Sequence, residues 1–158
     1  MIPDSDPAGI LAEMAKHEEA LGVLYRGYAE RFPELRGFWT RLSEEEAFHA
    51  ELLQAMRRKL AEGHLRPQPG RFNARAVRLS LEYVLQRISA LELERVSVLR
   101  ALSVTLDLES AIIERRFFET VAEDSPQIRH ILDRIREDTA GHIARVQEQW
   151  LKYGGREQ

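Results

Sequence analysis

Two acidic stretches, each with a histidine near its end, carry the residues most able to do chemistry in this sequence. EEEAFHA places Glu46 three residues before His49, and EDTAGHI places Thr139 three residues before His142. Residues three apart on an α-helix lie about 60° apart on one face, so a Glu-x-x-His pair can reach one cation. The first stretch therefore offers a carboxylate and an imidazole together, whereas the second keeps the histidine without the carboxylate.

The apolar periodicity indicates the helices that would position these residues. Apolar residues recur at alternating spacings of three and four, which is typical of amphipathic helices packed in a bundle. No segment alternates with a period of two, so no strands are expected. The four expected bundle helices are residues 7–31, 33–62, 97–121 and 126–152.

Several ionisable residues fall where this periodicity requires a core residue. Burying an unpaired ionised carboxylate costs several kcal/mol, so such positions are normally apolar or partnered. A divalent or trivalent cation is a partner that converts this cost into binding. The residues concerned are Glu18, Glu46, His49, Glu109 and His142.

The connections between the helices predict their arrangement. The first and second helices, and the third and fourth, are joined by short loops, which predicts two antiparallel hairpins. The connection between the hairpins is about 35 residues long and contains a further helical pattern at 73–94, enough to return the chain along the bundle. The sequence therefore predicts one all-α domain over residues 1–158, a four-helix bundle of two hairpins with a helical crossover.

The order of the buried residues matches a known ligand set. One Glu from each of two helices, with Glu-x-x-His from each of the other two, holds the metals of ferritin-like di-iron bundles. EEEAFHAELL and RALSVTLDLESAII, preceded by Glu18 and Tyr25, resemble the rubrerythrin-type ferritin-like family over essentially the whole chain. The resemblance implies a ferritin-like bundle with two non-haem irons that reacts with hydrogen peroxide or dioxygen.

The resemblance also implies a role for each matching residue. The carboxylate ligands would be Glu18, Glu46 and Glu109, with Glu46 or Glu109 bridging the irons. His49 and His142 would be terminal nitrogen ligands. Tyr25 would be a hydrogen-bonding tyrosine beside the site.

Two features depart from the family pattern. Thr139 stands where the family has a glutamate, and Asp138 is the candidate substitute ligand because it lies about 40° from His142 around the helix. Glu137, about 140° away, is expected to face solvent. The chain also has no cysteine and therefore no rubredoxin module, so an external electron donor is expected.

The expected activity is the reduction of peroxide or the oxidation of Fe(II). Carboxylate and imidazole ligands also suit Mn or Zn, so the metal does not follow from the residues. The alternative is a non-enzymatic helical bundle that acts through partner binding, with a mononuclear or empty site. In the metal-free case Arg95 or Arg116 would neutralise the carboxylates. A homodimer is the default assembly for a bundle of this size.

The composition sets the class of protein. The 158 residues are 44% hydrophobic and 31% charged, with a net charge of -3, which predicts a soluble cytoplasmic protein that binds neither membrane nor nucleic acid. The aromatic residues at the helical spacings are expected to be core residues. The remaining histidines lie in a loop or off the seams, the lines of apolar residues spaced three and four apart along each helix, and are expected at the surface. They are His17, His64 and His130.

Overall fold

The computed structural model describes residues 7–63, 74–114 and 126–154, and the regular structure in these ranges is entirely helical. This confirms the all-α class. The elements are α1 (Pro7–Arg31), η1 (Pro33–Leu35, a 3-10 turn), α2 (Arg36–Ala61), α3 (Ala74–Leu93), α4 (Val98–Glu114) and α5 (Pro126–Gly154).

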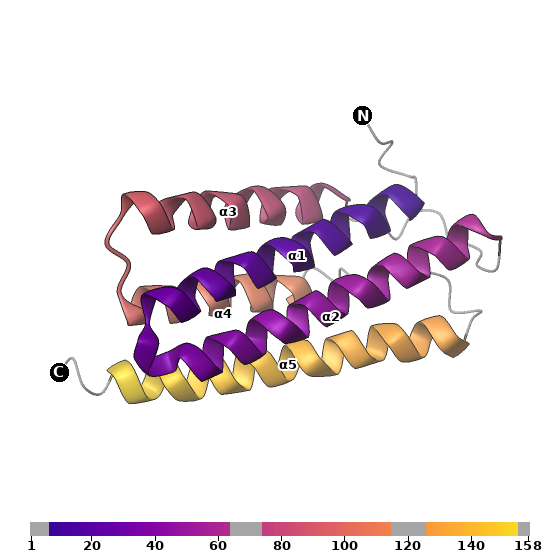
Figure 1. Ribbon diagram of the computed structural model, residues 1–158. Helices are drawn as coiled ribbons and strands as arrows, with labels where there is room; N and C mark the ends of the chain where they lie inside the picture. The colour runs from indigo at the N-terminus through magenta and orange to yellow at the C-terminus, as the bar shows by residue number, and fades with distance from the viewer. Residues whose placement is uncertain (1–6, 64–73, 115–125, 155–158) are drawn as a thin grey trace.

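The helices lie lengthwise beside one another (Figure 1). α1 and α2 form an antiparallel pair; α3 runs along α1, α5 runs along α2, and α4 lies behind this layer. The most extensive packing joins α1 to α2, α4 to α5, and α1 to α3. The two expected hairpins are thus packed pairs, and α3 is the helix that carries the chain back between them.

One expected boundary is wrong. The second helix was expected to begin at Pro33, but Pro33–Leu35 form the 3-10 turn and α2 begins at Arg36. Phe32 precedes the proline with φ −121° and ψ 81°, because the proline ring disfavours helical geometry in the residue before it. At its other end α2 stops before Gly63, whose φ of 80° is a left-handed conformation that glycine adopts without strain.

Some expectations lie outside the described residues. These are the 115–121 part of the third expected helix, residue 73 of the expected crossover helix, and the side chains of His64 and Arg116. No helix in the described ranges combines the length and apolarity that crossing a membrane requires.

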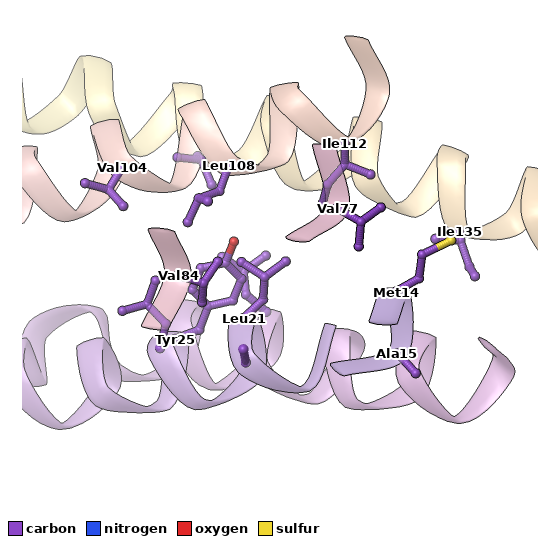
Figure 2. Packing of buried hydrophobic residues seen from close by; sticks show 14 of the residues in the cluster. Met14, Ala15, Leu21, Tyr25, Val77, Val84, Val104, Leu108, Ile112 and Ile135 are labelled. Atoms are coloured by element: carbon purple, nitrogen blue, oxygen red, sulfur yellow. The ribbon is translucent and has the colours of Figure 1, made fainter. Parts of the chain in front are cut away.

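The core is a continuous apolar cluster to which every long helix contributes. Figure 2 shows side chains from different helices converging on this core; among them are Met14 and Leu21 (α1), Val77 and Val84 (α3), Val104 and Ile112 (α4), and Ile135 (α5). Tyr25, Tyr28 and Trp39 are core residues as expected, but Trp150 is not, since 38% of it is exposed. This apolar packing determines which face of each helix is buried, and therefore which polar residues are buried with it.

Candidate metal centre

The polar residues expected in the core are buried there together. Glu18 comes from α1, Glu46 and His49 from α2, Glu109 from α4 and His142 from α5, and none is more than 3% exposed. They form two groups, Glu18–Glu46–His49 and Glu46–Glu109–His142. Within each group one ligand atom per residue lies within 4.8 Å of the others, and Glu46 belongs to both groups. Four helices thus bring carboxylates and imidazoles to one place.

Several atoms of this cluster are chemically unsatisfied. Among the described residues, Glu18 Oε2, Glu46 Oε1, Glu109 Oε2 and His142 Nδ1 are buried without a hydrogen-bond partner. Buried polar atoms are normally hydrogen-bonded, and an orphaned one calls for an explanation such as a bound ion. Three carboxylate oxygens and one imidazole nitrogen are ligands that iron, manganese and zinc accept. The donor set therefore fits a metal.

The two histidines are oriented alike. His49 Nδ1 lies 3.1 Å from Glu46 Oε2, and His142 Nδ1 lies 2.9 Å from Glu46 Oε1 and 3.5 Å from Glu109 Oε2. Neither His142 contact counts as a hydrogen bond. The rings stack with centroids 5.6 Å apart. Each ring therefore turns Nδ1 toward the buried carboxylates and Nε2 toward a partly exposed one.

Asp138 lies on the outside of the site. Its Oδ2 is 3.0 Å from His49 Nε2 and 3.6 Å from Arg134 Nε, and its side chain is 32% exposed. Asp138 belongs to neither of the two ligand groups. In this structure Asp138 contacts His49 on α2 rather than His142, its neighbour on the same helix. Its role as a direct ligand stays a prediction.

Thr139 does not replace the missing carboxylate. Its hydroxyl donates a hydrogen bond to the Ile135 carbonyl oxygen one turn earlier, at 2.8 Å. The side chain is buried, so its short reach and its bond to the helix backbone leave one wall of the site without an anionic donor. Glu137 is exposed, as expected.

Glu45 is a site residue that the periodicity missed. Its Oε2 lies 2.6 Å from His142 Nε2 and 2.5 Å from an Arg145 guanidinium nitrogen. The side chain is 30% exposed and lies off the buried face, one position before Glu46. The parallel between the two acidic stretches is the signal that could have identified it. Glu45 precedes Glu46-x-x-His49 as Asp138 precedes Thr139-x-x-His142, and each of these two carboxylates contacts the histidine of the other stretch.

Tyr25 joins the cluster from α1. Its hydroxyl donates a hydrogen bond to Glu109 Oε1 at 2.6 Å. Burial, together with the negative charge of Glu109, raises the pKa of Tyr25 well above its usual value. Tyr25 therefore stays a protonated donor that orients the Glu109 carboxylate.

The pKa values of the three buried glutamates are shifted by burial and by their neighbours' charges. Burial and the neighbouring Glu46 raise the pKa of Glu18 well above its usual range. Burial, followed by the charge of Glu109, raises the pKa of Glu46 to about 7. Burial opposes ionisation of Glu109 as well, but its contacts with His142 outweigh that effect and lower its pKa.

The pKa of His142 moves in the opposite sense. Burial alone would lower it, but the contacts with the Glu109 and Glu46 carboxylates raise it to about 11. Without a metal, an imidazolium at His142 therefore neutralises part of the acidic cluster. Arg95, expected as a neutralising cation in the alternative interpretation, is exposed to solvent instead.

The expectation that His17 lies at the surface is wrong. The ring is buried, and its Nε2 lies 2.7 Å from Ser80 Oγ on α3. Burial lowers the pKa of His17 to about 4. His17 lies off the seam of its helix, but α3 covers that second face of α1.

Comparisons with protein-family models, with curated proteins and with solved structures find no match.

Proposed function

We propose that this protein is a rubrerythrin-like, ferritin-like oxidoreductase with a non-haem di-iron centre. The observation that carries the proposal is the pair of buried Glu/His groups that share Glu46. A cation in each group, with Glu46 between them, would satisfy the orphaned oxygens and nitrogen described above. Manganese or zinc would suit the same ligands, so the metal is part of the proposal.

One set of residues would bind the ions, and an outer set orients the histidines of the first. Glu18, Glu46 and His49 would hold one ion, and Glu46, Glu109 and His142 the other. Outside them, Asp138 accepts from His49 Nε2–H and Glu45 from His142 Nε2–H, which fixes each ring so that Nδ1 faces inward. Carboxylates bound to the far nitrogen of a ligating histidine orient the ring and increase its basicity.

Iron would supply one-electron oxidation and reduction at this place. The substrates we propose are hydrogen peroxide or dioxygen as the oxidant, with Fe(II) as the reductant when the protein acts as a ferroxidase. With no cysteine in the chain, the electrons for repeated turnover would come from an external donor. We also propose that the protein acts as a homodimer.

A second candidate function is favoured by Thr139 and His142. Thr139 leaves the second group one carboxylate short of the family ligand set, and an imidazolium at His142 can stand in for a cation there. The corresponding candidate is a non-enzymatic bundle with a mononuclear site in the Glu18–Glu46–His49 group, acting through partner binding.

Metal analysis after anaerobic Fe(II) loading tests both candidates. We expect about two ions per chain in the wild-type protein. Glu46→Gln, which alters both groups, should lose both ions, and His142→Gln should lose the ion of its own group. Glu137→Gln is the matched control, because Glu137 is an exposed acid on the same helix as His142.

The outcomes separate the candidates. One ion per chain that survives in His142→Gln supports the mononuclear site. A protein that stays metal-free while circular dichroism shows it folded overturns the di-iron proposal.

A further inference from the structure

A line of aromatic rings leads away from the metal centre. Tyr25, bonded to Glu109, has its ring centroid 5.8 Å from that of Trp39, and the Trp39 ring lies 4.8 Å from that of Tyr28. Trp39 is on α2, seven residues before Glu46, so it lies two turns away on the same face of that helix. Figure 2 shows Tyr25 in the buried core from which this line begins.

Trp39 is unusual for a core tryptophan. Its side chain is fully buried, yet no described residue accepts a hydrogen bond from its Nε1–H. A buried tryptophan normally finds an acceptor for this group. Without one, the first oxidation step of the indole is the loss of an electron alone, and protons leave only when oxygen is added to the ring.

We propose that Trp39 supplies electrons to the metal centre through Tyr25 when hydrogen peroxide reacts there in the absence of an external reductant. The inference rests on the proposed function, because peroxide must react at the site. Trp39 is then a protective donor that draws excess oxidising power away from the buried ligands.

The electrons and atoms balance. Hydrogen peroxide takes two electrons and two protons to form two molecules of water. Trp39 gives up two electrons in successive one-electron steps, water adds one oxygen atom to the indole, and two protons are released. The net reaction converts Trp39 and hydrogen peroxide into hydroxytryptophan and water.

Beyond Tyr28, α3 packs along α1 and carries Tyr83, with the Arg87 guanidinium 5.3 Å from the centre of its ring. Tyr83 is partly exposed. When a reductant is present, this end of the line is where Trp39 regains its electron, and no hydroxytryptophan forms.

The alternative is that the rings are core packing and nothing more. Trp150, the second tryptophan of the chain, provides an internal control, because it is 38% exposed whereas Trp39 is fully buried. Peroxide acting from bulk solvent would oxidise Trp150 first. Oxidising equivalents generated at the metal centre would reach Trp39 first.

The test treats Fe(II)-loaded protein with peroxide without reductant and maps oxidised tryptophan by peptide mass spectrometry. We expect oxygen at Trp39 in preference to Trp150, and none at Trp39 when the protein is metal-free or ascorbate is present. Freeze-quenched samples should show a tryptophan radical by electron paramagnetic resonance that is absent from Trp39→Phe. Tyr25→Phe should reduce the oxidation of Trp39 per bound iron.

The outcomes are distinguishable. Iron-loaded protein that consumes peroxide but leaves Trp39 intact, or oxidises Trp150 alone, overturns the electron route and leaves the proposed function standing. Protein that binds no iron overturns both. Since the main comparison uses two tryptophans of the wild-type chain, a variant that fails to fold does not affect it.

Discussion

Glu45 and Asp138 show how residues off the buried face contribute to the candidate site. Each accepts from the outer nitrogen of one buried histidine, and each reaches the histidine of the opposite helical half. An arginine adjoins each carboxylate, Arg145 at Glu45 and Arg134 at Asp138. The contact with Arg145 and the hydrogen bond with His142 outweigh partial burial and lower the pKa of Glu45. Glu45 is therefore an ionised acceptor that can hold His142 in one orientation.

The first prediction concerns Glu45→Gln. Losing the charged acceptor should weaken metal affinity at the His142 group by roughly 10- to 100-fold, as is typical for such outer partners. Competition with a chelating fluorophore measures the dissociation constant. Glu44→Gln is the matched control, because Glu44 is the exposed neighbour. Equal affinities in the two variants would show that Glu45 has no part in binding.

The second prediction concerns Thr139→Glu, which restores a carboxylate at the buried wall. In the metal-free protein a further buried acid should lower the melting temperature, because the site already holds three carboxylates. With metal bound, the new ligand should strengthen binding, so the rise in melting temperature on loading should exceed that of the wild type. Differential scanning fluorimetry with and without metal measures both. A smaller rise than in the wild type would mean that this wall does not face the ion.

At the scale of helices, periodicity predicted which residues of the site share a face. The 3.6-residue repeat places Glu18, Glu46 and His49 inward because the apolar residues of the same seams must be buried. Periodicity could not predict that His17 is buried, because burial on a second face of α1 depends on where α3 packs. It could not predict the position of Asp138 either, since that depends on the rotation of α5 against α2.

The third prediction follows from the contact between α1 and α3. Burial lowers the pKa of His17 from 6.5 to about 4, so its contribution to stability is complete above pH 6.5 and is lost as the pH falls toward 4. The loss should total about 3 kcal/mol of unfolding free energy. Urea unfolding of the wild type and of His17→Gln across this pH range measures it as a difference, because Glu46 contributes to both proteins in the opposite sense. The stability of the wild type relative to His17→Gln should fall by this amount toward pH 4, whereas His130→Gln, at an exposed histidine, should follow the wild type.

The opposite result would show that His17 is not the source of this pH dependence. If the stability of His17→Gln falls as steeply with acid as that of the wild type, the acid sensitivity arises elsewhere in the fold.

For the whole molecule, protons and metal are alternative ways of neutralising one buried cluster. The raised pKa values of Glu46 and His142 stabilise the metal-free fold at low pH. That contribution is lost as the pH rises from 4.5 through about 7 for Glu46, and from 6.5 through about 11 for His142. A bound cation takes over the neutralisation and displaces these protons, so metal binding should strengthen as the pH rises.

The last prediction is that metal loading stabilises the fold, and does so more at pH 8 than at pH 5.5. At a free metal concentration of about 100 times the dissociation constant, binding should add about 2.7 kcal/mol, a rise of roughly 5 to 10 °C in melting temperature for a chain of this size. At pH 5.5 the protons on Glu46 and His142 compete with the ion, so the rise should shrink. Chelation should reverse it. A rise that does not depend on pH would place the ion on exposed carboxylates, because a cation in the buried cluster cannot bind without displacing its protons.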